Sequence, residues 1–543
     1  MKLLEENTAQ KLRGGYYTPT EITDFITDWA FSDKRKRTVL EPSCGDGAFL
    51  ESFEDQLKFI KNCTAIELIE EEAVKATEKM KMHANIDIIN NDFFDEFETK
   101  LQHNKFDLIL GNPPYIRYQY LTPEQRQSHS NIIVNNGMRS NKLINAWVSF
   151  LVASVQLLSE EGKLAMVIPA ELLQVGYAEE LRLFLVNNLS KLTVITFKEL
   201  VFPDVQQEVI ILLGEKFKSN EENIISLVDL DNLSQLNTDE VNRRIEYKEV
   251  DHSKDKWTKY FLNNEQLKVV EEITRDNKFT NFSEFASVNV GITTGNNKYF
   301  SVTQDIVKEY GLQEISLPLI GRSAHARGIY FNEKDWIANV NDGLRAQLLL
   351  FPDLPHNKLS KGQRDYIELG EVMNENKGYK CRIRRNWYHV PSVYAPDAFF
   401  LRRNDTFPKF VLNEVDAVST DTMHRVRFKE GINHKKVLLS YYNSITLAYT
   451  EIEGRSYGGG VLEVLPSEVE KILLPNIQNM NEDKVDRLLL MIDNTIRNKD
   501  DIKDVLPQID KEVLVKYLGI DSKVVESFRE IWQSLMTRRR LRK

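Results

Sequence analysis

Long apolar runs are missing from this chain of 543 residues. A membrane-spanning helix needs about 18 or more consecutive apolar residues, and no stretch of the sequence approaches that length. The first apolar cluster is interrupted by Lys11, Arg13 and Glu21, so it does not read as a signal peptide either. We therefore expect a cytoplasmic protein that does not enter a membrane.

Cysteine and positive charge are also scarce. The three cysteines, Cys44, Cys63 and Cys381, lie far apart in the sequence, which argues against a disulfide framework and against a metal site. The 71 basic residues are outnumbered by 81 acidic ones, giving a net charge of −10. This balance counts against a nucleic-acid partner, although a binding face needs only a local excess of cations. The length predicts two or three domains.

The stretch FDLILGNPPYIRY, Phe106 to Tyr118, joins an apolar strand to a rigid polar tip. Pro113 and Pro114 have no N–H for a sheet and fix φ near −65°, so the strand must end before them. Open α/β sheets bind their ligands at the carboxyl ends of strands. The tip is therefore a candidate binding site.

Two acceptors in this tip suit an amine whose lone pair is delocalised, such as the exocyclic nitrogen of adenine. If the Asn112 side-chain oxygen and the Pro113 carbonyl each accept one N–H, the nitrogen becomes more tetrahedral and its lone pair can attack an electrophilic methyl group. Tyr115 would offer a ring face to the base. The alternative for the tetrapeptide taken alone is a strand-ending turn with a surface tyrosine.

Four predicted strands end in polar residues, namely Glu41, Glu67, Asp92 and Asn112. Helical sequence or a loop follows each of them. Repeated strand and helix units imply parallel strands with right-handed crossovers, which bring these four tips to one edge of the sheet.

The loop after the first of these strands contains Gly45 and Gly47, which would let a ligand approach the backbone. An acidic residue at the end of the second strand, here Glu67, is the usual partner of a ribose diol. Asp92 could accept a hydrogen bond from an adenine amino group, with Phe93 as an apolar surface for the ring. The acidic residues at these strand ends suit a cationic sulfonium ligand better than a pyrophosphate.

Further elements of the N-terminal part can be assigned from periodicity. We expect helices over Glu21 to Phe31, from Ala48, over Glu70 to Met82, Leu143 to Leu158 and Glu179 to Asn187, and strands at Thr38 to Leu40, Lys163 to Pro169, 191–197 and 208–215, the last two closing the sheet. Arg117 to Asn141 reads as a polar loop over the site. Phe202 would emerge near the site, or it is simply a core aromatic.

The pattern changes from about Phe217, where a polar and acidic connector over 217–260 leads to a C-terminal region over 261–543. The segment from Lys377 to Lys409 contains eight Lys or Arg residues and two acidic residues, and its basic residues are interleaved with aromatic ones. Cations beside rings suit a nucleic-acid surface, though a solvated basic face is the alternative. The glycines of RSYGGG permit close backbone approach, and the tail RRRLRK could touch phosphate or only keep the terminus soluble.

Taken together, the segments YYTP, EPSCGDGAF, AIEL, NDFF, NPPY and VFPDVQQ occur in an order and spacing that resemble the γ-class adenine-N6 DNA methyltransferases of type II restriction-modification systems. The match covers roughly residues 11–215 with specific motifs, and GRSYGGGVLE resembles part of their target-recognition domains. Only about 70 residues separate Glu41 from Asn112, so a recognition domain must follow the catalytic one.

The resemblance implies a Rossmann-like S-adenosylmethionine-dependent methyltransferase domain of α/β class over 1–216, followed by an α+β DNA target-recognition domain with a helical C-terminus. The cofactor S-adenosyl-L-methionine would be held by Tyr16, Thr18, Pro19, Glu41, Ser43, Gly45, Glu67, Asp92 and Phe93. The catalytic set would be Asn112, Pro113, Pro114, Tyr115 and Phe202, with Phe202 on the other side of the extruded base from Tyr115. DNA contacts are expected from Arg382, Arg384, Arg385, Trp387, Arg402, Arg403, Arg455 and Tyr457, and no metal is required.

We therefore expect a bacterial or phage-encoded enzyme that methylates adenine N6 in double-stranded DNA by base flipping and direct transfer. It would act as a monomer on DNA and protect host DNA beside a separate restriction endonuclease. NPPY also occurs in methyltransferases of protein glutamine or rRNA guanine, for which the large basic and aromatic C-terminal half has no evident use. A fused nuclease is disfavoured because the cofactor motif begins near residue 16. A DNA-binding subunit with an idle site is disfavoured by the intact tetrapeptide.

Overall fold

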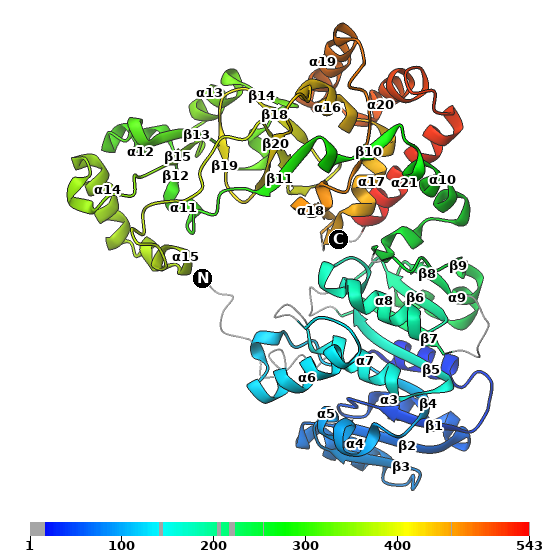
Figure 1. The fold of residues 1–543 in the computed structure, drawn as a ribbon. Helices are drawn as coiled ribbons and strands as arrows, with labels where there is room; N and C mark the ends of the chain where they lie inside the picture. Colours follow the sequence, from blue (N-terminus) through cyan, green and yellow to red (C-terminus); the bar gives the residue numbers. More distant parts are fainter. Residues whose placement is uncertain are drawn as a thin grey trace. The chain divides into compact units, whose positions relative to one another are not determined.

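A computed structural model describes residues 17–140, 145–202, 208–216, 223–253, 255–457 and 459–541. The chain divides into two compact units, one ending at Leu267 and the next beginning at Lys268, and each is considered by itself (Figure 1). Tyr16, expected at the cofactor, lies outside the described residues. No helix within the described ranges is long and apolar enough to cross a membrane.

The first unit is built on a nine-stranded sheet in the order β3-β2-β1-β4-β5-β7-β6-β8-β9. Its strands are β1 Arg37–Glu41, β2 Ile60–Glu67, β3 Ile86–Asn90, β4 Phe106–Gly111, β5 Leu158–Pro169, β6 Lys191–Phe197, β7 Val209–Glu215, β8 Ile224–Leu230 and β9 Lys248–Glu249. The first five strands pair in parallel, whereas β7 is antiparallel to both β5 and β6. The predicted parallel arrangement is confirmed.

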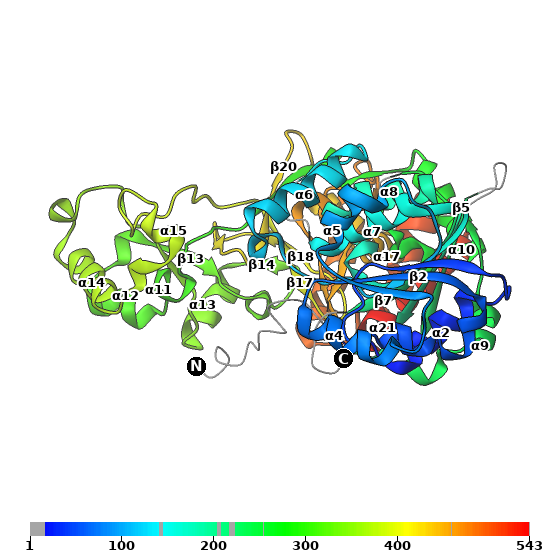
Figure 2. The same ribbon diagram turned by 90° about the horizontal axis from the view of Figure 1, so that it is seen from below.

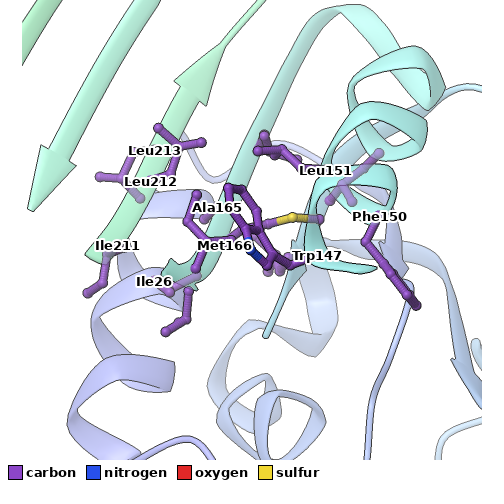
Figure 3. Close-up of a cluster of buried hydrophobic side chains, with 14 of the residues drawn as sticks. Ile26, Trp147, Phe150, Leu151, Ala165, Met166, Ile211, Leu212 and Leu213 are labelled. Carbon is purple, nitrogen blue, oxygen red and sulfur yellow. The ribbon is translucent and has the colours of Figure 1, made fainter. Parts of the chain in front are cut away.

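Helices cover both faces of this sheet (Figure 2). They are α2 Thr20–Ala30, α3 Ala48–Ser52, α4 Glu70–Met80, α5 Phe93–Glu96, α6 Pro123–Asn135, α7 Ala146–Leu157, α8 Glu179–Asn188 and α9 Thr238–Arg244. α3 contacts α2 and α4 on one face, while α7 contacts α6 and α8 on the other. Figure 3 shows Trp147 and Leu151 of α7 packed with Met166 of β5, all three fully buried.

Two strands of this sheet were not expected. Residues 217–260 were assigned to a connector, yet β8 pairs in parallel with β6 over their whole length and β9 adds an antiparallel edge. The apolar residues Ile225, Val228 and Leu230 are buried in the core of the first unit. The polar, acidic sequence before and after β8 concealed a strand whose apolar side chains fill the sheet face.

The polar loop expected over Arg117 to Asn141 is also corrected, because most of it is helix α6. The Thr122 hydroxyl accepts a hydrogen bond from the Gln125 backbone amide, the Gln125 side-chain oxygen accepts one from the Thr122 backbone amide, and Pro123 occupies the first turn. This capping box is a readable helix start. The largely polar composition that suggested a loop reflects a helix whose buried contacts are few, chiefly Ile132 and Ile133.

The second unit is of the α+β class, as expected. Its main sheet has the order β11-β20-β16-β18-β14, beside sheets β12-β15-β13-β19, β17-β22-β21 and β10-β23. The strands are β10 Phe279–Asn281, β11 Ala286–Val290, β12 Ser301–Val302, β13 Ser316–Ile320, β14 Tyr330–Phe331, β15 Gln347–Leu349, β16 Ala398–Leu401, β17 Arg403–Asn404, β18 Phe410–Asn413, β19 Val418–Ser419, β20 Met423–Phe428, β21 Arg455–Tyr457, β22 Val461–Glu463 and β23 Leu473–Pro475.

Helices of this region are α10 Asn264–Arg275, which begins before the unit boundary, α11 Asn297–Phe300, α12 Gln304–Tyr310, α13 Glu333–Asn341, α14 Lys361–Val372, α15 Tyr379–Arg382, α16 His434–Tyr441, α17 Ser444–Glu453, α18 Pro466–Val469, α19 Glu482–Asn498, α20 Leu506–Asp510 and α21 Ser522–Leu541. Arg538 to Leu541 of the basic C-terminal segment therefore belong to the long helix α21, which contacts α17. Arg539 of α21 forms a buried ion pair with Glu451 of α17 at 2.8 Å.

Candidate active site

The carboxyl ends of four neighbouring strands carry the polar residues singled out from the sequence. Glu41 ends β1, Glu67 ends β2, Asp92 follows β3 and Asn112 follows β4. These strands are adjacent in the sheet order and run in parallel, so their ends meet at one edge.

The loop between β1 and α3 contains two glycines with left-handed backbone. Gly47 has φ 90°, and a Cβ atom there would lie 3.3 Å from the Cα of Ala76, so this glycine permits α3 to pack on α4. Gly45 has φ 54°, and a Cβ atom there would meet nothing within 4 Å. The backbone at Gly45 therefore faces open space, which a ligand can occupy.

Glu67 fixes this loop. Its Oε2 accepts the Gly45 amide at 2.9 Å and its Oε1 accepts the Ile69 amide at 2.8 Å. Burial raises the pKa of Glu67, and the two amides oppose that rise. Each carboxylate oxygen has a further lone pair, so the side chain can still accept from a diol.

Glu41 is the most unusual group at this edge, with only 1% of the residue exposed. Its Oε2 is buried and has no hydrogen-bond partner among the described residues. Burial, followed by the negative charge of Glu67, raises the pKa of Glu41 well above its usual value. A buried carboxylate without a partner is costly unless a cation reaches it. Asp46 in the same loop is instead paired with Lys79 at 3.1 Å.

Asp92 caps α5 by accepting the Phe94 amide at 2.8 Å, and burial raises the pKa of its carboxyl group. A hydrogen bond from the Gln125 side chain acts in the opposite direction on this pKa. Phe93 is 3% exposed, and its ring stacks on that of Phe150 with centroids 5.2 Å apart. Phe93 thus lies within a packed aromatic cluster. Gln125, in a segment whose polar composition is typical of a loop, is a neighbour of Asp92 that the sequence does not indicate.

Asn112 is held by hydrogen bonds on several sides. Its Nδ2 donates to the Thr18 hydroxyl at 3.2 Å, and its Oδ1 accepts from the Tyr115 hydroxyl at 2.8 Å. The Ser43 hydroxyl donates to the Asn112 backbone carbonyl at 3.3 Å. Thr18 and Ser43, both expected beside a cofactor, are therefore tied directly to Asn112.

Pro113 is buried and Pro114 is partly exposed. Within the described parts of the chain, no hydrogen-bond donor reaches the carbonyl oxygen of Pro113. Pro19 precedes α2 and accepts the amides of Ile22 and Thr23 through its carbonyl. The described donors of the protein therefore leave the Pro113 carbonyl unused, while Pro19 has a helix-starting role.

The two aromatic residues of the expected catalytic set are both covered. Tyr115 is 8% exposed, and its hydroxyl also lies 2.9 Å from the carbonyl oxygen of Val167 on β5. Phe202 is 7% exposed, and both rings belong to the hydrophobic core of the first unit.

The eight residues expected to contact DNA fall into different environments. Three arginines pair with carboxylates of the second unit: Arg402 lies 2.7 Å and Arg403 3.5 Å from Glu463, and Arg455 lies 2.6 Å from Glu468. Arg402 and Arg403 share one carboxylate, and Arg455 has another to itself. Neither Glu463 nor Glu468 stands beside its partner in the sequence, so these pairings were not visible there.

The other members of this set are less constrained. Arg382, Arg384 and Arg385 form no ion pair with any described carboxylate, although Arg384 donates to the Thr293 carbonyl at 2.9 Å. Trp387 donates to Glu371 at 3.0 Å and packs on Tyr299, with ring centroids 5.1 Å apart. Tyr457 is 44% exposed.

The strand order, the glycine loop after β1, the acidic tips of β1 and β2 and the Asn-Pro-Pro-Tyr tip of β4 together define a methyltransferase of the Rossmann-like class. The chain belongs to the N-6 DNA Methylase family, which matches residues 2–294. A second family, the C-terminal domain of Type II methyltransferase M.Eco57I, matches residues 254–514. The protein is accordingly a DNA adenine methyltransferase.

Relatives of known name are similar over different lengths. Type II methyltransferase M.AccI of Acinetobacter calcoaceticus is 25% identical over 92% of this chain and 93% of its own length. Type II methyltransferase M.HincII of Haemophilus influenzae is 30% identical over 42% of each chain. Among solved structures, the type IIG restriction endonuclease BpuSI matches 97% of this chain and 66% of its own, with 14% identity and a TM-score of 0.41.

Proposed function

We propose that this protein moves a methyl group from S-adenosyl-L-methionine to adenine N6 in double-stranded DNA, as the modification enzyme of a restriction-modification system. The observation that carries the proposal is the tip of β4, where the Asn112 amide is fixed and the Pro113 carbonyl accepts no hydrogen bond from the described residues. The similarity to proteins named Type II methyltransferases supports the biological role.

The residues at the sheet edge fit the cofactor. The buried and unpartnered Oε2 of Glu41 would receive the ammonium group of the methionine part, beside the open backbone of Gly45. Glu67 would accept from the ribose hydroxyls and Asp92 from the adenine amino group. When bound, the cofactor supplies a methyl group made electrophilic by the adjacent sulfonium.

The protein's own contribution to methyl transfer is to bind and orient the amine. An amide oxygen can accept two hydrogen bonds, and Oδ1 of Asn112, which accepts one from Tyr115, would accept another from the adenine N–H. Thr18 holds the amide nitrogen, so this acceptor is preorganised before the base arrives. The carbonyl of Pro113 would take the other N–H, which frees the nitrogen lone pair for in-line attack on the methyl group.

No covalent intermediate on the enzyme is needed. Burial raises the pKa of Cys44 and of Cys63, so both thiols stay protonated and are poor nucleophiles. The proton lost by the methylated nitrogen would pass to solvent.

The target adenine must leave the base stack to reach Asn112, at a cost of a few kcal/mol. Tyr115 and Phe202 would flank the extruded base. Both rings are covered in the free protein, so this stacking requires their side chains to become accessible when DNA binds. The hydrogen bond between Tyr115 and Asn112 couples that rearrangement to the catalytic amide.

The test is methyl transfer from radiolabelled S-adenosylmethionine to duplex DNA, RNA and protein in parallel, followed by nucleoside analysis of the product. We expect N6-methyladenine in the duplex alone. Label in RNA or protein, or in cytosine, would overturn the proposal. Sequencing modified bases from expressing cells would give the recognised site, and co-expression of a neighbouring endonuclease would test protection. Sedimentation with duplex would test the expected monomer.

A further inference from the structure

Two guanidinium groups of the second unit flank a single tyrosine ring. The Cζ atoms of Arg425 and Arg427 lie 4.1 and 4.9 Å from the centroid of Tyr394. Both arginines belong to β20, and residues two apart in a strand point to the same face of the sheet. The ring therefore fixes two cations side by side.

Backbone carbonyls orient these cations. Arg425 is only 9% exposed, and it donates to the carbonyls of Val290 at 3.0 Å and Ser392 at 2.9 Å. Arg427 is exposed and donates to the Ala395 carbonyl at 3.0 Å. Carbonyl oxygens align a guanidinium but leave its full charge in place, so the cluster carries two positive charges in fixed positions.

Neighbouring side chains do not neutralise the pair. On β11, the residues directly opposite Arg425 and Arg427 are the uncharged Asn289 and Ser287. Asp397, which precedes β16, accepts a backbone amide of β20 at 2.9 Å instead. Within the described ranges neither arginine forms an ion pair with a carboxylate. This contrasts with Arg402, Arg403 and Arg455, which pair with Glu463 and Glu468, and it leaves both charges available to an external anion.

A third cation is anchored on the same backbone segment. Arg384 donates to the carbonyl of Thr293, three residues beyond the Val290 carbonyl that holds Arg425. The Nη1 atom of Arg384 is buried and has no partner among the described residues. Guanidinium groups held by two carbonyls three residues apart, with no carboxylate partner among the described residues, suit a ligand with repeated negative charges better than a single anion.

We propose that Arg425 and Arg427, held by Tyr394, bind phosphate groups of the duplex DNA substrate. The inference rests on the proposed function. Guanidinium forks match phosphate oxygens in a bidentate manner, and such contacts fix the register of a protein on DNA without reading its sequence. A rigid pair of this kind would position the second unit on the duplex.

The test is the salt dependence of DNA affinity, measured by fluorescence anisotropy with the full chain and a labelled duplex. Each lost phosphate contact reduces the slope of log Kd against log salt concentration by about 0.9. We expect this change for Arg427→Gln and for Arg425→Gln. Arg427→Lys should retain the slope but bind more weakly, and Tyr394→Ala should weaken binding with the slope unchanged, because both arginines keep their charge.

Arg275→Gln is a matched control. Arg275 is an exposed arginine of α10 that pairs with Glu271 at 3.6 Å, so its replacement removes the same formal charge and should leave the slope unchanged. Because Arg425 is buried, its replacement can also destabilise the fold, so the thermal melting temperature of each variant is measured. The inference is therefore judged on the variants of the exposed Arg427.

An Arg427→Gln slope equal to that of the unaltered protein would refute the inference. If the slope is unchanged but the unaltered protein methylates the duplex normally, only the inferred phosphate contact is refuted and the proposed function stands. If the unaltered protein neither binds nor methylates any duplex, both the proposed function and this inference fail.

Discussion

Replacing Asn112 by alanine separates the chemistry from cofactor binding. The side chain would accept one of the two amine hydrogens, while the tie from the Ser43 hydroxyl to this residue runs through the backbone carbonyl and survives the substitution. The glycine loop is fixed independently by Glu67. The structure therefore predicts that Asn112→Ala removes an acceptor for the amine and leaves the cofactor-binding loop in place.

The magnitude follows from the preorganised amide. Removing one fixed hydrogen-bonding group from a reacting centre costs about 2.7–4 kcal/mol, which corresponds to a loss of about 10²–10³ in kcat. The dissociation constant for S-adenosylmethionine should change by less than about threefold, because contacts to that part of the loop are untouched. Single-turnover methyl transfer to a saturating duplex gives the first quantity, and isothermal titration calorimetry gives the second.

Tyr115→Phe is the graded companion to this variant. It keeps the ring and removes only the hydroxyl that contacts Asn112 and Val167, so a loss of about 0.5–1.5 kcal/mol, or about twofold to thirteenfold in kcat, is expected. The reasoning fails if Asn112→Ala retains normal turnover. It also fails if cofactor affinity falls in parallel with kcat, because the residue would then act through the loop and not on the amine.

Further outcomes concern charge, burial and backbone conformation. Because burial raises the pKa of Glu41, the cofactor-free protein should lose stability as pH rises above about 4.3. Urea titrations at several pH values should show a smaller decline in stability for Glu41→Gln. The same variant should bind S-adenosylmethionine at least about tenfold more weakly. Arg539→Met should lower the unfolding free energy by about 3–5 kcal/mol, because it leaves the buried Glu451 carboxylate unpaired, and adding Glu451→Leu should restore most of it. Gly47→Ala should cost about 1–2 kcal/mol, because φ is 90° there and the new methyl group would press on Ala76; thermal melting would show it, and an unchanged melting temperature would contradict that geometry.

Much of the catalytic unit was predictable because its signals are local. Periodicity identifies each strand and the helix that follows it, and the right-handed crossover between successive strands makes them parallel neighbours in one sheet. The parallel sheet and the placement of Glu41, Glu67, Asp92 and Asn112 at one edge follow from four such units. The helix α6 was missed although its capping box is local, because the segment's polar composition was given more weight than its start signal.

Other features depend on contacts between residues far apart in the chain. Strand β8 lies in sequence that looks like a connector, and its pairing with β6 is what buries its apolar side chains. Likewise, nothing near Arg402 or Arg455 in the sequence shows that Glu463 and Glu468 neutralise them. Arg425 and Arg427 form no ion pair with a described carboxylate, and nothing near them in the sequence indicates this.

By itself, the sequence determined the kind of chemistry. It places an asparagine and a proline carbonyl at the end of one strand and acidic residues at the ends of neighbouring strands, and the alternation of strands and helices brings these ends together. Only the tertiary structure decided how Asn112 is held, by Thr18 from one side and Tyr115 from the other, and which cations of the second unit remain without a counter-charge. The physical reason is that periodicity and turn chemistry act over a few residues, whereas hydrogen bonding and charge compensation join side chains that only the completed fold brings together.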